Sequence, residues 1–284
     1  MKKLTIPELE AKATEIRQDI IKMLEHAGTG HTAGPLGLAD ILAALYFDIL
    51  KHDPKKPDWD QRDIFLLSNG HCVPVLYVSM AQAGYFDKKE LMTLRQFGSR
   101  LQGHPERTKL PGLENTSGPL GSGLSQACGM SLAMRMNQDN HRWIYVVMGD
   151  GEQNEGNVWE AAMLAGKYKL GNIIAFTDRN FIQIDGSTED VMPLGDLKGK
   201  WESFGWNVYE IDGNNIEQII DACAMGRAAI DKPTMIIANT IPGKGVDFME
   251  YNFRWHGIPP NSEQAKEALK DLRTLKGKIR SEHE

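Results

Sequence analysis

The chain has 284 residues, of which 41% are hydrophobic and 25% charged, a balance that is typical of a globular protein and excludes a disordered or membrane-embedded one. This length is ample for a buried core and fits one large α/β domain better than two small ones. A formal net charge of -6 speaks against long-range attraction to nucleic acid or to an anionic membrane surface, so local groups must hold any anionic ligand.

The cysteines predict a reducing compartment. They are far apart, odd in number and without the spacing of a metal site. Their positions are Cys72, Cys128 and Cys223. We therefore expect the protein in the cytoplasm, and we expect Cys72 to have a packing role although it follows a histidine.

Two helices are predicted near the N-terminus. Apolar residues recur at helical spacing from Leu9 to Met23 with charges between them, which predicts an amphipathic helix and not a signal peptide. A glycine-rich turn over residues 28–37, an apolar helix over residues 38–50 and a polar linker follow.

Four short apolar runs, rich in β-branched residues, predict buried parallel strands. They cover residues 62–68, 143–148, 172–177 and 234–240, and residues 206–211 are a fifth candidate. Helical patterns lie between them, over residues 76–82, 122–136, 158–168 and 216–230. This alternation predicts an α/β fold, with a doubly wound, mainly parallel sheet and helices on both faces.

The last part of the chain, residues 261–284, is highly charged and has one apolar helical face. That face carries Ala268, Leu269, Leu272 and Leu275. We expect residues 1–284 to form a single domain, with the N-terminal helix as an extension and this segment as a charged tail.

Polar residues follow three of the predicted strands. They are Ser68-Asn69-Gly70-His71, Gly149-Asp150-Gly151 and Thr177-Asp178-Arg179-Asn180. Ligands of doubly wound sheets bind beyond the carboxyl ends of the strands, so we expect these groups to converge on one edge.

Asp150 and Asn180 can supply oxygen ligands to a hard divalent cation such as Mg²⁺. Such a cation prefers carboxylate, carbonyl and phosphate oxygens in octahedral geometry. An isolated Gly-Asp-Gly is more often a simple turn, and the position of Asn180 at the end of the next strand is what favours a metal site.

Gly-Asp-Gly followed by a helix, a strand and an asparagine is the thiamine diphosphate signature, and the whole chain resembles the N-terminal domain of the transketolase family. Further motifs occur in the order that the family has. The complete set is Gly28-Thr29-Gly30-His31, Ser68-Asn69-Gly70-His71, Gly103-His104-Pro105, Gly118-Pro119-Leu120-Gly121-Ser122-Gly123, Gly149-Asp150-Gly151 and Trp255-His256-Gly257. Six ordered matches are far more specific than any one of them.

The resemblance implies a metal site that grips the diphosphate of thiamine diphosphate. Asp150, Asn180 and the backbone carbonyl of Ile182 are expected to hold Mg²⁺, or else Ca²⁺ or Mn²⁺. Gly151 is expected to offer its backbone N–H to a phosphate, because no side chain stands in the way.

Three further positions are implied to lie near the cofactor. Gly118, Pro119 and Leu120 correspond to the loop beside the cofactor rings, although a helix-start turn is about equally plausible for them alone. The position of Glu155 belongs in the family to a buried carboxylate network between two active sites, and that of Asp185 lies near the cofactor ring. On pattern alone, a solvated helix charge is an alternative for Glu155, and a simple turn aspartate is a nearly equal alternative for Asp185.

Four histidines lie beside glycines in these motifs. A histidine with a pKa near neutrality can move protons or stabilise a developing alkoxide. The resemblance implies that His31 and His256 contact the donor sugar or the diphosphate, that His71 lies beside the diphosphate, and that His104 steadies the hydroxyl of the carbanion intermediate. Together they imply transfer of a two-carbon ketol unit from a ketose to an aldose.

The first two motifs depart from the family pattern in the residues that follow the histidine. His31 is followed by Thr-Ala-Gly-Pro where the family usually has Pro-Gly-Gly, and His71 is followed by Cys-Val-Pro. A split relative with another donor, such as a sulfosugar transketolase or a dihydroxyacetone synthase, is therefore an alternative.

Members of the family continue into a pyrimidine-binding domain, whose glutamate activates the cofactor, and a C-terminal domain. Nothing after Trp255-His256-Gly257 is long enough to encode either. We therefore expect a second chain that supplies both domains, in a dimer of heterodimers that acts on sugars. A non-catalytic nucleotide-binding module is an alternative from another class, but no Gly-x-Gly-x-x-Gly opens the first strand–helix turn.

Overall fold

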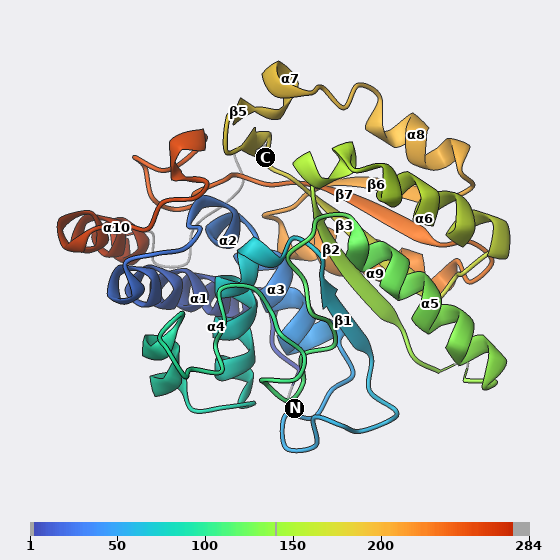
Figure 1. Cartoon of the computed structure of the whole chain (residues 1–284), viewed down its shortest axis with the longest axis horizontal. Coiled ribbons are helices and arrows are strands. Elements are labelled where there is room, and N and C mark those ends of the chain that lie inside the picture. The colour runs from blue at the N-terminus through green and yellow to red at the C-terminus, as the bar shows by residue number, and fades with distance from the viewer. Residues whose placement is uncertain (1–2, 140, 275–284) are drawn as a thin grey trace.

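The computed structural model describes residues 3–139 and 141–274. Its centre is a five-stranded parallel sheet in the order β1-β2-β3-β7-β6 (Figure 1). The strands are β1 (Ile64–Leu67), β2 (Ile144–Gly149), β3 (Ile173–Arg179), β6 (Asn207–Asp212) and β7 (Thr234–Asn239). All five predicted strands are confirmed, with ends that shift by one or two residues.

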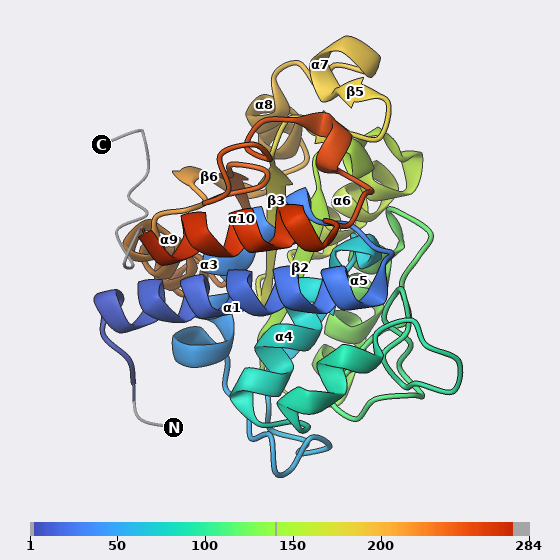
Figure 2. The ribbon, with the colours of Figure 1, turned by 90° about the vertical axis from the view of Figure 1, so that its left-hand side faces the viewer.

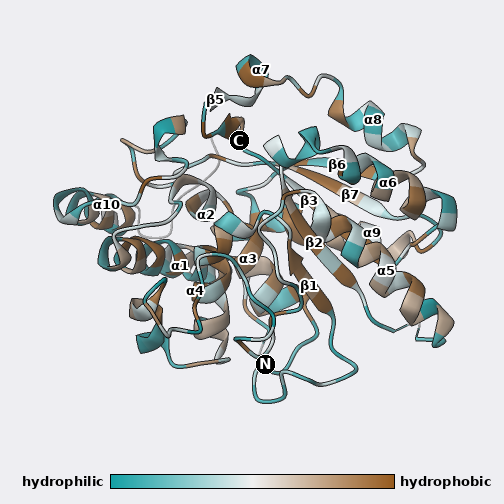
Figure 3. Cartoon of the chain, viewed as in Figure 1, coloured by the Kyte–Doolittle hydropathy of each residue, from teal (hydrophilic) through white to brown (hydrophobic). Residues whose placement is uncertain are grey.

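Burial explains why four strands gave a stronger sequence signal than the fifth. β1 and β3 are buried at every residue, and β2 and β7 at every residue but the last. β6 lies at the edge of the sheet and keeps most of its residues partly exposed. The hydropathy colours of Figure 3 show the same concentration of apolar residues on the central strands. No helix in the described part of the chain is long and apolar enough to cross a membrane.

The direction of each crossover decides which face of the sheet a helix covers. From β1 through β2 and β3 to β6 the chain advances one way, and right-handed crossovers place α5 (Ser122–Met136), α6 (Gly156–Tyr168) and α8 (Leu197–Ser203) on one face. The return from β6 to β7 reverses that direction, so α9 (Ile216–Ala228) covers the opposite face. The predicted doubly wound fold is thereby confirmed.

Alternate residues of β2 divide the core between the two faces. Ile144, Val146 and Met148 join the apolar cluster beneath α5, α6 and α8. Tyr145 and Val147 join the larger cluster that contains α9 and the N-terminal helices. Both faces of the sheet are therefore covered, and its open edge at the carboxyl ends of the strands is left for polar residues.

The N-terminal helices pack on the α9 side of the sheet. They are α1 (Ile6–Ala27), α3 (Ala39–Ala44) and α4 (Val73–Ala83), and α10 (Ser262–Thr274) runs beside α1 (Figure 2). The predicted apolar stripe of α1 is buried, as are Ala268 and Leu272 of α10. Leu275, which completes the predicted face of the tail, lies outside the described residues.

Several short elements were not predicted, because so few residues show no periodicity. α2 (Ala33–Gly37) lies within the glycine-rich turn, and the helix expected over residues 38–50 is divided into α3 and a π-helical turn, Leu45–Ile49. β4 (Ile182–Gln183) and β5 (Gly186–Ser187) form a hairpin that leads into α7 (Thr188–Val191). The 3-10 turns are Gly70–Cys72, Lys88–Thr93, Gly151–Asn154 and Phe253–Trp255.

Candidate functional site

A cavity of about 440 Å³ lies at the carboxyl ends of β1, β2 and β3, a volume suited to a cofactor-sized ligand. Its walls include residues from each of the three predicted polar strand ends. The predicted site residues that line it are His31, His71, His104, Gly118, Leu120, Asp150, Gly151, Glu155, Asn180, Ile182, Asp185 and His256. Pro119 does not line it, and its carbonyl oxygen instead accepts the Ser122 hydroxyl at 2.9 Å, as a helix-start turn does.

Asp150 directly follows β2 and is nearly inaccessible to solvent, at 2% exposure. Its Oδ1 accepts the Gly151 N–H at 2.7 Å, and its Oδ2 accepts the Phe181 N–H at 2.7 Å and Arg179 Nη1 at 3.2 Å. Burial raises the pKa of Asp150 to about 6, while these donors act in the opposite direction. The Gly151 N–H that was expected on a phosphate is therefore engaged by Asp150 in this conformation.

The Asn180 amide is oriented by hydrogen bonds at both ends. Its Nδ2 donates to Asp178 Oδ2 at 2.9 Å, and its Oδ1 accepts the Ile182 N–H at 3.0 Å. The amide oxygen therefore lies on the side of Ile182, whose carbonyl is the third predicted metal ligand. Within residues 3–139 and 141–274 no three His, Cys, Asp or Glu side chains gather as a metal site. Asp150, Asn180 and the Ile182 carbonyl offer oxygen atoms only, which is the ligand type that Mg²⁺ takes together with phosphate oxygens.

Asp178 is a buried acid that the sequence analysis did not assign to the site. It accepts the Thr240 hydroxyl at 2.5 Å as well as the Asn180 amide. Burial, with the nearby Asp150 carboxylate, raises the pKa of Asp178 to about 7, and the two donors oppose this rise. Its position two residues before Asn180 was a signal, but spacing alone does not reveal that it orients the amide.

Three of the predicted histidines form a cluster. The ring centroid of His71 lies 4.9 Å from that of His31 and 5.2 Å from that of His256, and the His31 and His256 centroids are 5.6 Å apart. The Thr32 hydroxyl donates to the Ile258 carbonyl at 2.7 Å and so joins the loops of His31 and His256. His104 lines the same cavity.

Burial keeps these imidazoles neutral at pH 7. It is the largest cause that lowers the pKa of each of the four histidines, and it brings the pKa of His31 to about 4. Neighbouring positive charge adds to the effect, from Arg95 for His31 and His104. A neutral imidazole can donate from one ring nitrogen and accept at the other, which suits it to bind hydroxyl groups.

Several polar atoms around this cavity are buried without a hydrogen-bond partner among the described residues. They are both amide atoms of Asn69, Nε2 of Gln183 and the Nδ1 atoms of His31 and His256. Buried polar groups are nearly always bonded, so such a set around one cavity indicates that a polar ligand belongs there. The residues present therefore fit a diphosphate cofactor.

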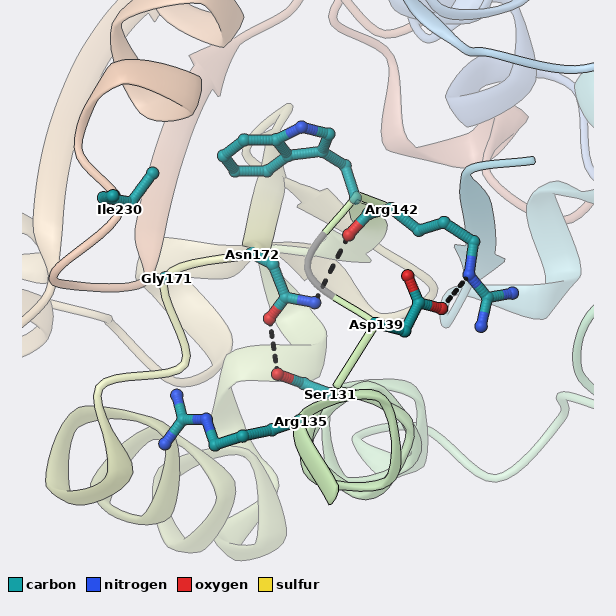
Figure 4. A pocket seen from close by; sticks show the side chains of 8 residues that line it. Ser131, Arg135, Asp139, Arg142, Gly171, Asn172 and Ile230 are labelled. Atoms are coloured by element: carbon teal, nitrogen blue, oxygen red, sulfur yellow. Dashed lines mark hydrogen bonds and ion pairs between the residues drawn. The ribbon is translucent and has the colours of Figure 1, made fainter. Parts of the chain in front are cut away.

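A second cavity, of about 370 Å³, lies at the opposite ends of the strands. Its polar side chains, unlike several of those of the first cavity, are hydrogen-bonded to protein groups. Figure 4 shows that its polar groups bond one another: the Ser131 hydroxyl donates to Asn172 at 2.5 Å and Arg142 donates to Asp139 at 2.5 Å. Arg135 donates to the carbonyls of Tyr168 and Lys169. The cavity at the carboxyl ends is therefore the better ligand site.

Glu155 and Asp185 reach the cavity from its rim. Glu155 is exposed at the start of α6, and Asp185 lies in the turn between β4 and β5. Cys72 is buried, and burial raises the pKa of its thiol, which agrees with the expected packing role. The roles assigned to these residues stay predictions. The structure places most of the residues around one cavity.

The sequence matches the family model described as transketolase, thiamine diphosphate binding domain, over residues 9–276. It is 42% identical over 265 residues to the 6-deoxy-6-sulfo-D-fructose transketolase subunit of Clostridium sp. (strain MSTE9), an alignment that covers 93% of this chain and 96% of that one. It is 40% identical over 280 residues to an apulose-4-phosphate transketolase subunit of Phocaeicola vulgatus, with 99% of both chains covered. Identity to transketolase 2 of Escherichia coli (strain K12) is 38%, over 92% of this chain but 40% of that protein.

Solved structures of transketolases are also similar to this chain. The transketolase of Campylobacter jejuni superimposes with a TM-score of 0.89 at 33% identity, over 98% of this chain and 46% of that one. A transketolase of Pichia stipitis superimposes with a TM-score of 0.88 at 34% identity, over 95% of this chain and 41% of that one. The chain thus spans less than half the length of these two transketolases.

Proposed function

The chain belongs to the transketolase family, and we propose that it is the N-terminal subunit of a two-chain transketolase. In this proposal residues 1–284 form the diphosphate-binding domain and, with a partner chain, transfer a two-carbon ketol unit from a ketose to an aldose. The observation that carries the proposal is the meeting of Asp150, Asn180 and the histidine cluster in one cavity, where five buried polar atoms have no hydrogen-bond partner among the described residues.

The strand ends would hold the cofactor. Asp150, Asn180 and the Ile182 carbonyl would bind Mg²⁺, and Gly118 and Leu120 would flank the rings. When bound, thiamine diphosphate supplies the carbon nucleophile that takes up the ketol unit, a chemistry that no side chain offers. The protein contributes the position and orientation of the reacting groups.

The histidines would act on the sugar. Because burial holds the pKa of His31, His71 and His256 below its usual range, each is neutral and can bind a hydroxyl at one nitrogen. A neutral imidazole is also the form that accepts a proton from a hydroxyl as a carbonyl forms. His104, at the same wall, would hold a second hydroxyl.

A partner chain is proposed because this chain matches separately encoded subunits nearly end to end, at 96% and 99% of their length. We propose that the partner carries the pyrimidine-binding and C-terminal domains and that two heterodimers pair. Exposed apolar side chains near the cavity support a docking partner: Ile184, Met192 and Ile258 are 67%, 57% and 53% exposed.

A cytoplasmic location is part of the proposal. All three cysteines are free and buried, as is usual in a reducing compartment. Disulfide formation in the native protein would contradict this location, and thiol titration with and without denaturant would detect it.

Calorimetry tests the cofactor site. Wild-type protein should bind thiamine diphosphate only when Mg²⁺ is present, and Asp150→Asn should weaken this binding by more than roughly tenfold, because it removes the one carboxylate of the metal set. Asp63→Asn is the matched control: Asp63 is also buried and accepts two backbone N–H groups, but outside the cavity. Tighter binding of a dinucleotide than of thiamine diphosphate would instead support a nucleotide-binding module.

The donor is tested once the partner chain has been purified with this one. Ketol transfer from a ketose phosphate would support the proposed activity, and transfer from a sulfonated ketose alone would support the sulfosugar alternative, which the 42% identity to a sulfofructose transketolase subunit favours. Transfer to formaldehyde would support the dihydroxyacetone synthase type. Turnover by this chain without a partner would contradict the two-chain proposal.

A further inference from the structure

Glu152 connects three loops around the cofactor cavity, although its side chain is 2% exposed. Its Oε1 accepts the Ser68 hydroxyl and, at 2.6 Å, the Gly121 N–H. Its Oε2 accepts the Gly149 N–H at 3.0 Å. The donors come from the loop after β1, the loop before α5 and the end of β2, so one carboxylate fixes three segments that are far apart in the sequence.

The approach of these loops is too close for side chains to intervene. Ser68 Oγ also accepts the Gly123 N–H at 3.0 Å, and a Cβ at Gly123 would lie 2.4 Å from the Ser68 Cβ. A Cβ at Gly121 would lie 2.0 Å from Asn157 Oδ1, and Gly121 has a left-handed φ of 83°. The motif glycines of this loop therefore permit the contact with Glu152.

Each of the three loops also contributes to the cavity wall. The first carries His71, the second Gly118 and Leu120, and the third Asp150, while Glu152 itself lies in the wall. Asp63 offers a structural comparison, because it accepts the Lys51 N–H at 2.9 Å and the Trp143 N–H at 3.0 Å near the opposite ends of the strands.

We propose that Glu152 is a positioning residue for the cofactor, which sets the distance between the ring-flanking loop at Gly118–Leu120 and the metal-binding end of β2 at Asp150. This inference rests on the proposed function. A carboxylate is acceptor-only and can serve all three donors, whereas a glutamine at this position turns an N–H₂ group toward a backbone N–H. Glu152→Gln keeps the size of the side chain but sets its N–H₂ group against the N–H of either Gly149 or Gly121, so the end of β2 or the loop before α5 must shift.

The test compares Glu152→Gln with Asp63→Asn by calorimetry with thiamine diphosphate at saturating Mg²⁺ and by thermal unfolding. Both variants should unfold at a lower temperature than the wild type. Only Glu152→Gln should weaken cofactor binding, by about tenfold or more, since the loss of a group that orients metal-binding residues typically costs roughly 10–100-fold in affinity. Equal cofactor affinity in Glu152→Gln and the wild type would overturn the proposal.

Ser68→Ala provides a second route if Glu152→Gln does not fold. It removes one donor to Glu152 and the acceptor of the Gly123 N–H but leaves the carboxylate in place, so we expect a several-fold loss of cofactor affinity together with a lower melting temperature. An unchanged affinity in Ser68→Ala would then overturn the positioning role. Failure of the wild type to bind thiamine diphosphate would instead remove the proposed function itself, which separates the two conclusions.

Discussion

The imidazoles of His31, His71 and His256 share a desolvated space in which a positive charge is unfavourable. Burial is the main cause that lowers the pKa of each, and for His31 the positive charge of Arg95 and the neighbouring histidines add to it. An unfolded chain would protonate these groups near pH 6.5, whereas folded His31 stays neutral until about pH 4. The cluster therefore keeps the form that binds hydroxyls, at the cost of stability in acid.

His31→Gln is expected to reduce the loss of stability on acidification. Because the pKa of His31 is lower in the folded state, the unfolded state binds more protons between pH 6.5 and about pH 4. The stability is therefore full above pH 6.5 and falls as the pH decreases through this window. Melting temperatures at about pH 7.5 and about pH 4.5 should differ less in the variant than in the wild type. His141→Gln, which replaces an exposed histidine, should keep the wild-type difference, and a wild-type difference in His31→Gln would contradict the prediction.

At the scale of elements, α5 and α6 carry glycines in opposite surroundings. A Cβ on Gly166 of α6 would lie 1.9 Å from the Phe204 carbonyl oxygen, at the turn between α8 and β6. A Cβ on Gly129 of α5 would meet nothing within 4 Å. Gly166 thus permits a close approach of helix and loop, whereas Gly129 only lowers the helix propensity of α5.

The two alanine substitutions should therefore have opposite signs. Gly129→Ala should raise the free energy of unfolding by about 0.5–1 kcal/mol. Gly166→Ala should lower it by about 1–3 kcal/mol or more, because backbone atoms would have to move to accept the methyl group. Urea denaturation of both variants measures these changes. Effects of the same sign would show that the Phe204 contact does not restrict α6.

At the scale of the whole molecule, a buried polar network joins the N-terminal helices to the second half of the sheet. Arg17 of α1 donates to the Leu36 carbonyl at 3.0 Å and, through its guanidinium fork, to Asp40 of α3. Asn214, after β6, donates to Asp40 Oδ2 at 2.7 Å and accepts the Ile241 N–H at 2.8 Å. These residues lie far apart in the sequence, so the network forms only when the chain is fully folded.

Asp40→Ala should lower the free energy of unfolding by about 3–5 kcal/mol, because it leaves the buried Arg17 charge uncompensated. Glu90→Ala is the matched control, since its ion pair with Arg100 lies at the surface and should contribute less than about 1 kcal/mol. Urea denaturation with a single cooperative transition would measure both losses. A loss at Asp40 no larger than that at Glu90 would mean that Arg17 finds other partners.

Much of the site was predictable because the carboxyl ends of the strands of a doubly wound sheet lie at one edge, where ligands bind. Residues that follow different strands are therefore expected to lie close together. Asp150, Asn180 and His71 were found in this way, whereas His31, His104 and His256 were implied by the resemblance to the family. Glu152 and Asp178 were missed, since their importance lies in the hydrogen bonds that they accept from other loops. Pro119 was predicted but does not line the cavity. A sequence motif consists of neighbouring residues, whereas a hydrogen bond between two loops can be recognised only in the three-dimensional structure.

The sequence by itself determined the strands, the long helices, the fold class and the family resemblance, because periodicity and motif order are properties of neighbouring residues along the chain. Only the tertiary structure decided that the three imidazoles lie 4.9–5.6 Å apart, that burial keeps them neutral, and that Glu152 joins three loops. Burial and contact depend on segments brought together from distant parts of the chain. The sequence therefore identified the histidines as candidate groups for binding hydroxyls and moving protons. The fold buries them, which lowers their pKa and favours the neutral imidazole.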